Sequence, residues 1–249
     1  MLVPMTATSA APIVSTAELH RQYGEGEAAV HALRGVSIAF PARQFTAIMG
    51  PSGSGKSTLM HLLAGLDRPT SGSVVVDGRE LANLDDKKLT ALRRDKLGFV
   101  FQAFNLIPVL TASENITLPL MLAGAKVDDV WFATLVEAVG LGDRLTHRPA
   151  ELSGGQQQRV AIARALIARP AVVFADEPTG NLDSKSASEV LELLRRAVDE
   201  FGQTVIMVTH DPGAAAVADR VVMLRDGGVV HDGASASAEG LLDLMKQVA

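Results

Sequence analysis

The chain has 249 residues, of which 47% are apolar, so it is long enough to bury a sizeable core. It contains no cysteine, which excludes disulfides, thiol catalysis and thiolate metal sites. The formal net charge of −5, without a basic stripe interleaved with aromatic residues, argues against nucleic acid as a partner.

Charged residues interrupt every apolar run well short of the roughly 18 residues that a membrane-spanning helix needs. The first lysine or arginine is Arg21, so residues 1–13 lack the basic start of a signal peptide and are predicted to form a flexible tail. We expect residues 14–249 to form a single domain. Apolar and alternating patterns predict the first three strands, at residues 14–21, 30–40 and 45–49.

Residues 50–57 read G-P-S-G-S-G-K-S and match the phosphate-binding loop pattern G-x-x-x-x-G-K-[ST]. Its glycines can turn backbone N–H groups towards an anion, and Lys56 adds a positive charge. A helix predicted at residues 56–63 adds its unpaired amides, and the Ser57 hydroxyl can ligate Mg²⁺. The loop therefore predicts a nucleoside triphosphate site, with an ordinary Gly/Ser turn as the alternative. The predicted nucleotide-binding residues are Gly50, Pro51, Ser52, Gly53, Ser54, Gly55, Lys56, Ser57 and Thr58.

The predicted secondary structure changes in the middle of the chain, from a mixture of strands and helices to helices alone. Before this point, a strand at 73–77, a charged helix at 86–95 and a strand at 97–101 are predicted. Residues 113–122 and 127–139 then show helical patterns with no convincing strand between or around them. We therefore expect a helical subdomain, over about residues 103–165, inserted in an α/β body.

Helices and strands alternate again towards the end of the chain. The predicted helices are 154–168 and 184–201, the strands are 171–175, 204–208, 220–224 and 229–232, and an amphipathic helix closes the chain. Ser186 and Glu189 are spaced as a capping box for the second of these helices. The alternation predicts an α/β fold.

An apolar strand ends in the carboxylates Asp176 and Glu177. Beside a phosphate loop, Asp176 would hold Mg²⁺ through its water shell, and Glu177 would orient or deprotonate the water that attacks the γ-phosphate. The alternative is an acidic turn after a strand.

Residues 152–156 read L-S-G-G-Q and open a helix, so Ser153 and the glycine amides form a second potential anion site. A helix cap without a ligand is the alternative. The motif resembles the signature of ATP-binding cassette (ABC) ATPases, and the resemblance covers roughly residues 14–232. It implies a P-loop NTPase fold with a RecA-like core, an antiparallel β subdomain and an α-helical subdomain. It also implies ATP hydrolysis in a head-to-tail homodimer. Each ATP would lie between the phosphate loop of one subunit and the signature of the other, formed by Leu152, Ser153, Gly154, Gly155 and Gln156.

The same resemblance assigns roles to single residues. Gln102 matches the Q-loop glutamine that touches Mg²⁺ and the attacking water, and His210 matches the histidine that contacts the γ-phosphate. Asp183 matches the D-loop, although it can also cap the following helix. Tyr23 lies where the family places an aromatic ring against adenine, with a partly buried strand tyrosine as the alternative. The implied catalytic residues are Glu177, His210 and Gln102, the implied metal ligands are Ser57, Gln102 and Asp176, and the cofactors are ATP and Mg²⁺.

Residues 66–72 and 101–116 are similar to the branch of the family that includes MacB, LolD and FtsE. This implies a separate transmembrane permease, a location on the cytoplasmic side of the membrane, and export of a lipophilic, peptide or lipoprotein substrate. A regulatory module that signals through a membrane partner without transport is the alternative. Phe104, Leu106, Ile107 and Leu110 are candidate permease contacts, or equally core residues of the helical subdomain.

Overall fold

The computed structural model describes residues 11–248. Most of the predicted tail, residues 1–10, lies outside the described residues. Ile13, which the sequence places in that tail, is tied into the fold: its N–H donates to the Phe40 carbonyl at 2.9 Å and its carbonyl accepts from the Asp77 N–H at 2.8 Å. The backbone pairing therefore includes residue 13.

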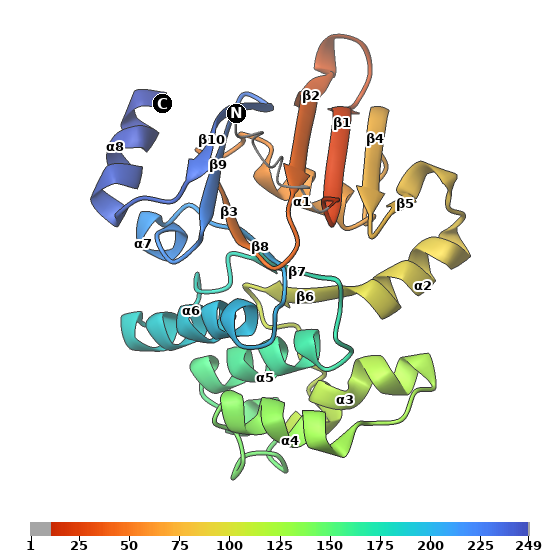
Figure 1. Cartoon of the computed structure of the whole chain (residues 1–249), viewed down its shortest axis with the longest axis vertical. Coiled ribbons are helices and arrows are strands. Elements are labelled where there is room, and N and C mark those ends of the chain that lie inside the picture. Colours follow the sequence, from red (N-terminus) through yellow and green to blue (C-terminus); the bar gives the residue numbers. More distant parts are fainter. Residues whose placement is uncertain (1–10, 249) are drawn as a thin grey trace, which may run out of the picture.

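A six-stranded sheet with the order β10-β9-β3-β8-β7-β6 forms the centre of the molecule (Figure 1). Five strands are parallel and β10 is antiparallel to its neighbour β9. Parallel strands covered on both faces need apolar residues on both sides, which explains why they read as continuous apolar runs. The strands are β3 (Phe45–Met49), β6 (Leu97–Phe101), β7 (Val172–Asp176), β8 (Val205–Val208), β9 (Arg220–Arg225) and β10 (Gly228–Ala234).

Two apolar clusters cover the two faces of this sheet. In β3, Phe45, Ala47 and Met49 join one cluster, while Ile48 joins the other, as the two-residue period of a strand requires. The first cluster includes side chains of α3 (Ala112–Ala123), α4 (Asp129–Ala138), α5 (Gly154–Leu166), α6 (Ser184–Asp199), α7 (Pro212–Ala215) and α8 (Ala238–Val248). The second includes side chains of α1 (Lys56–Leu63) and α2 (Asp86–Lys96).

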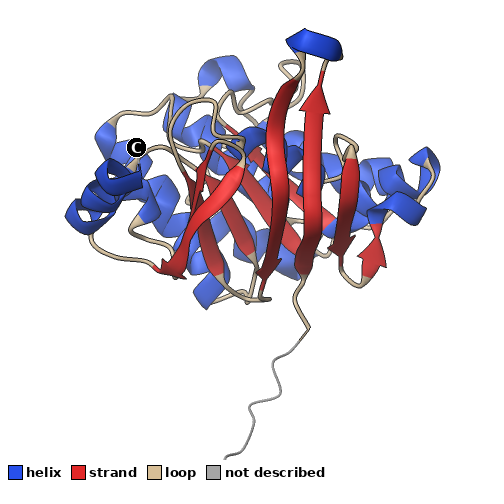
Figure 2. Ribbon diagram, turned by 90° about the horizontal axis from the view of Figure 1, so that it is seen from above, coloured by secondary structure: helices blue, strands red, loops and turns tan. Residues whose placement is uncertain are grey.

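A second, four-stranded antiparallel sheet with the order β2-β1-β4-β5 packs over α1. Figure 2 shows its long strands side by side. Its strands are β1 (Val14–Tyr23), β2 (Val30–Phe40), β4 (Ser71–Val76) and β5 (Arg79–Glu80). Short 3₁₀ turns lie at Gly26–Ala28, Leu81–Asn83 and Pro149–Glu151.

The segment between β6 and β7 projects as a group of helices formed by α3, α4 and α5 (Figure 1). Helix α3 begins with a capping box, in which the Thr111 hydroxyl accepts from the Glu114 N–H and the Glu114 carboxylate accepts from the Thr111 N–H. It ends at Gly124, whose left-handed conformation stops the helix.

The predicted helices and strands agree with the structure to within two residues at each end. The strand β5 and the helix α7 were not predicted, because two and four residues are too short to show a period. The predicted capping box of Ser186 and Glu189 is wrong. Asp183 is the cap of α6, and its carboxylate accepts from the N–H groups of Lys185 and Ser186 at 3.1 and 3.0 Å.

Within residues 11–248, no helix combines the length and the apolar character that crossing a membrane requires.

Candidate nucleotide-binding site

The phosphate loop runs from the end of β3 to the start of α1, and two of its glycines lie close to the backbone of other strands. Gly50 has a φ of 146°, and a Cβ there would lie 2.1 Å from the Leu224 carbonyl oxygen. Gly55 caps α1 with a φ of 102°, and a Cβ there would lie 2.5 Å from the Ala32 carbonyl oxygen. Only glycine fits either position, because each conformation and each contact excludes a side chain.

Lys56 lies across this loop. Its ammonium group donates to the carbonyls of Gly50 and Pro51 at 2.8 and 2.9 Å. Burial lowers the pKa of Lys56, while the negative charges of Glu177 and Asp176 act in the opposite direction. The chain thus holds a partly desolvated cation at the positive end of a helix, which suits a polyphosphate.

A cleft of about 550 Å³ opens over the loop. Eight of the nine predicted loop residues line it, together with Glu177 and His210. The sequence did not indicate four other lining residues, which come from β2 and α8: Val30, His31, Ala32 and Met245.

Ser54 is the exception among the loop residues. Its side chain is buried, and its hydroxyl has no hydrogen-bond partner among the described residues. Its carbonyl accepts from the Gly227 N–H at 3.1 Å, so Ser54 joins the loop to the turn between β9 and β10.

The carboxylates after β7 lie at the edge of the sheet next to this cleft. In the strand register, Asp176 pairs with Phe101 of β6 on one side and with Val208 of β8 on the other. Burial is the main cause that raises the pKa of Asp176; the charge of His61 on α1 acts against it. His61 is a neighbour that no sequence motif indicated.

Glu177 has a left-handed backbone with a φ of 45°, a costly conformation for a residue with a Cβ. Its N–H donates to the Val208 carbonyl at 2.9 Å. Its carboxylate oxygen Oε1 lies 2.8 Å from Nδ1 of His210, which follows β8. The fold therefore brings two of the predicted catalytic side chains into direct contact.

Gln102 follows β6 but does not line the cleft. Its side-chain amide donates to the Asn181 side-chain carbonyl at 3.1 Å, and the Asn181 amide donates to the Gln102 backbone carbonyl at 3.0 Å. Asp183 lies two residues further along, where it accepts from the Ser186 hydroxyl at 2.8 Å. Hydrogen bonds from Ser186 lower the pKa of Asp183.

The signature residues lie away from the loop of their own chain. Ser153 caps α5 in a capping box: its hydroxyl accepts from the Gln156 N–H at 3.3 Å, and the Gln156 side chain accepts from the Ser153 N–H at 2.9 Å. Gly155 is buried against α6, since a Cβ there would lie 2.8 Å from the Ser186 hydroxyl oxygen. Leu152 is a buried core residue. Over the described residues, the lining of the cleft includes no residue of this motif.

Tyr23 also lies outside the lining of the cleft. Its hydroxyl donates to the Asp67 carboxylate at 2.8 Å, and the guanidinium of Arg21 lies over its ring, 4.4 Å from the centroid. The residue keeps 40% of its surface exposed, so its neighbours do not enclose it.

In the part of the chain that the structure describes, no group of three or more His, Asp and Glu side chains is placed to hold a metal ion.

A parallel sheet with a glycine-rich loop between a strand and a helix, and with carboxylates at the end of a nearby strand, defines a P-loop nucleoside triphosphatase. Comparison with family models narrows this class. The model described as "ABC transporter" matches residues 33–180, and the chain belongs to this family as an ATP-binding cassette ATPase.

Relatives that are 49% identical to the chain include the following two proteins. One is a "Macrolide export ATP-binding/permease protein MacB" of Marinobacter nauticus, for which the match covers 89% of the chain and 34% of the relative. The other is an "Uncharacterized ABC transporter ATP-binding protein" of Thermotoga maritima, with 87% of the chain and 93% of the relative covered. The chain thus spans about a third of the length of the MacB relatives it matches.

Solved structures support the same family. The ATP-binding cassette MJ0796, in a dimeric post-hydrolysis state bound to ADP and Pi, is 43% identical with a TM-score of 0.80, over 90% of the chain and 99% of the relative. CbiO1 of Clostridium perfringens, part of the ABC transporter complex cbiONQ, is 28% identical with a TM-score of 0.82, over 96% of the chain and 95% of the relative.

Asp176→Asn should stabilise the ligand-free chain. Burial raises the folded-state pKa of Asp176, so the folded state resists ionisation of this carboxyl and loses stability as the pH rises through the raised pKa. Below the ordinary carboxyl pKa, about 4, both states are protonated and the gain disappears. Thermal melting in EDTA without nucleotide should give a higher Tm for the variant at pH 7.5, with a smaller difference as the pH falls.

Asp183→Asn is the matched control. Hydrogen bonds lower the pKa of Asp183, so the same substitution there should not raise the Tm at pH 7.5. An Asp176→Asn protein that melts at or below the unsubstituted chain at that pH would contradict the assigned cause.

Proposed function

We propose that the chain binds ATP with Mg²⁺ in the cleft over residues 50–58 and hydrolyses it as a head-to-tail homodimer that drives a transmembrane permease. The main support for this proposal is that the start of α1 and the start of α5, the two potential phosphate-binding sites of the chain, do not line the same cleft. Helix α1 opens into the cleft, whereas none of the signature residues before and in α5 lines it. A second copy supplies the missing signature, and the dimeric structure of the MJ0796 relative supports this arrangement.

The contacts of Glu177 support a role as the residue that orients the attacking water and accepts its proton. The hydrogen bond of its N–H to the Val208 carbonyl and its contact with His210 hold the carboxylate in the lining of the cleft. The exposed His210 ring contacts the γ-phosphate, and Lys56 neutralises charge that develops on the phosphate oxygens. Tyr23 stacks on the base with the accessible part of its ring.

The oxygen-rich donor set fits Mg²⁺ rather than a softer metal. The desolvated Asp176 carboxylate gains most from a nearby divalent cation, and the exposed Ser57 hydroxyl lies at the start of α1. Asp176, Ser57 and Gln102 would hold the ion, which supplies charge neutralisation between the phosphate oxygens. Asp183 joins the subunit interface next to the signature of its own chain.

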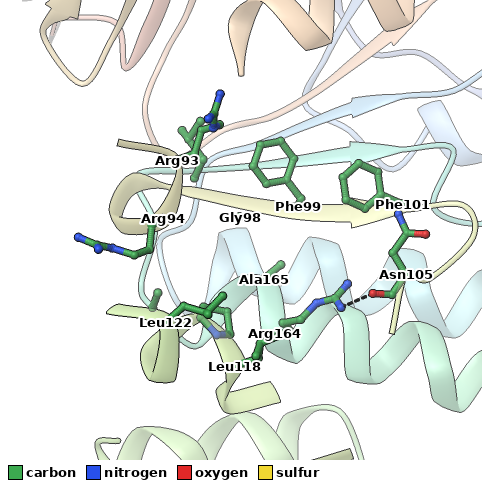
Figure 3. A pocket seen from close by; sticks show the side chains of 13 residues that line it. Arg93, Arg94, Gly98, Phe99, Phe101, Asn105, Leu118, Leu122, Arg164 and Ala165 are labelled. Atoms are coloured by element: carbon green, nitrogen blue, oxygen red, sulfur yellow. Dashed lines mark hydrogen bonds between the residues drawn. The ribbon is translucent and has the colours of Figure 1, made fainter. Parts of the chain in front are cut away.

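A groove beside β6 supports a permease partner, and Figure 3 shows the side chains that line it. Its volume is about 400 Å³. Apolar side chains of β6 and α3 line it, and arginines lie among them: the lining includes Phe99, Phe101, Leu118, Leu122, Arg93, Arg94 and Arg164. None of the four contacts suggested by the sequence lines this groove; Leu106, for example, packs against the larger core cluster. We assign the groove to a permease segment and propose that the chain lies on the cytoplasmic side of the membrane as a peripheral subunit.

The proposed substrate class is supported by the relatives rather than by the site. A chain 49% identical to a protein named for macrolide export fits export of a lipophilic, peptide or lipoprotein substrate. The cleft itself is common to all such cargoes, because it contacts only the nucleotide.

Glu177→Gln should keep ATP binding and lose turnover by about a hundredfold or more, because glutamine retains the shape but not the proton-accepting charge. Phosphate release and binding of a fluorescent ATP analogue measure the two properties. Glu200→Gln, at an exposed residue paired with Arg196, is the control and should behave as the unsubstituted chain. Unchanged turnover in Glu177→Gln would remove this residue from the chemistry.

Mixing two inactive variants should restore hydrolysis. Lys56→Ala impairs the phosphate loop and Ser153→Glu places a negative charge in the signature, so every site in either homodimer is defective. In a mixed dimer one site combines both intact halves, so an equal mixture should regain about a quarter of full activity. A mixture no more active than its components would exclude a composite site.

Leu122→Asp should weaken co-purification with the cognate permease, because it puts a carboxylate in the apolar part of the groove. Leu122 is largely exposed, which makes the change compatible with folding. Val130→Asp, at an exposed residue of the neighbouring helix α4 outside the groove, is the matched control. Equal recovery of the permease with both variants would assign the groove another role.

A further inference from the structure

Two consecutive residues after Gln102 adopt a conformation that is unfavourable for side chains. Phe104 has a φ of 60° and Asn105 a φ of 52°, both left-handed. Asparagine tolerates this region, but a bulky residue such as phenylalanine rarely adopts it. Other contacts must therefore hold this segment in place.

Arg164 of α5 supplies those contacts. Its guanidinium donates through Nη2 to the Phe104 carbonyl at 2.8 Å and through Nη1 to the Asn105 carbonyl at 2.6 Å; Figure 3 shows the bond to Asn105. A planar guanidinium fits two adjacent acceptors in one fixed geometry. Among residues 11–248, no carboxylate lies within ion-pair distance of Arg164. The hydrogen bonds of this half-buried cation therefore go to the backbone carbonyls of Phe104 and Asn105.

The same segment is anchored on both sides of Gln102. The Phe101 carbonyl accepts from the side-chain amide of Gln158, a fully buried residue of α5, at 3.3 Å. Gln102 itself exchanges two hydrogen bonds with Asn181. The ring of Phe104 lies against the signature, since a Cβ on Gly154 would be 3.7 Å from its Cζ. The backbone on either side of Gln102 is thus fixed from one helix.

We propose that Arg164 is a positioning residue for Gln102: by holding the Phe104 and Asn105 carbonyls, it fixes the left-handed turn that sets where the Gln102 side chain lies. The inference rests on the role proposed for Gln102 in hydrolysis. Arg164 touches neither nucleotide nor water in this scheme and acts only through the backbone of residues 103–105.

Hydrogen exchange tests whether Arg164 holds the backbone after Gln102 in place. Arg164→Lys keeps the positive charge but cannot bond two carbonyls in the planar geometry, so peptides covering residues 101–106 should exchange about tenfold faster in the full-length chain without nucleotide. Arg169→Lys is the control, because this exposed arginine bonds to Asp128 and should leave those peptides unchanged. Equal exchange in Arg164→Lys and the unsubstituted chain would overturn the proposal.

A double-mutant cycle tests the functional half. Arg164→Lys should lower kcat about five- to tenfold with KM within about twofold, and in a Gln102→Ala background the same substitution should change kcat less than about twofold. The same loss in both backgrounds would overturn the proposal, because Arg164 would then act independently of Gln102. If circular dichroism shows that the lysine variant is misfolded, Arg164→Gln, which has a shorter side chain and a single amide NH₂ group in place of the guanidinium, replaces it in both measurements.

The two proposals fail in different ways. If Gln102→Ala alone leaves kcat unchanged, the role of Gln102 in hydrolysis is wrong and the functional half of the inference falls with it. The exchange rates of residues 101–106 still decide whether Arg164 holds the segment.

Discussion

Close backbone contact around the phosphate loop is the constraint on which the rest of the structure depends. Gly50 packs against a carbonyl of β9 and Gly55 against a carbonyl of β2, so the loop is pressed between the central sheet and the antiparallel sheet. The Ser54 carbonyl adds a hydrogen bond to the turn after β9. The antiparallel sheet therefore covers α1 and also helps to fix the conformation of the loop. A side chain at either glycine would clash with the backbone and force the loop into another conformation.

The parallel sheet brings the candidate site residues outside the phosphate loop together at one edge. Gln102 follows β6, Asp176 is the last residue of β7 and His210 follows β8, and these three strands are neighbours in the sheet. Residues far apart in the chain meet there because the carboxyl ends of parallel strands share an edge. The chain is strained at this edge, since Glu177, which contacts His210, has a left-handed backbone conformation. Such strain persists only when the surrounding sheet holds it.

Helix α5 connects the regions of the proposed mechanism. Its first turn carries the signature, Gln158 reaches the end of β6, and Arg164 both lines the groove and bonds to the segment after Gln102. In the proposed mechanism, one helix therefore contacts the groove assigned to the permease, the backbone after Gln102 and, through the signature, the nucleotide of a second copy. Each contact within the chain is a hydrogen bond or a packing contact.

Local chemistry in the sequence was sufficient to predict all helices and strands except β5 and α7, the glycine-rich loop, the start of a helix after Ser153 and the two carboxylates at the end of β7. Each depends on residues within one or two helical turns, through periodicity, glycine conformation or capping. Tertiary structure alone decided the burial of Ser54, the pairing of Gln102 with Asn181, the contact of Tyr23 with Asp67 and the lining of the groove. These features join residues 44 to 79 positions apart or depend on packing between separate elements. Local sequence patterns cannot predict such contacts, because these contacts form only when the sheets and helices pack together.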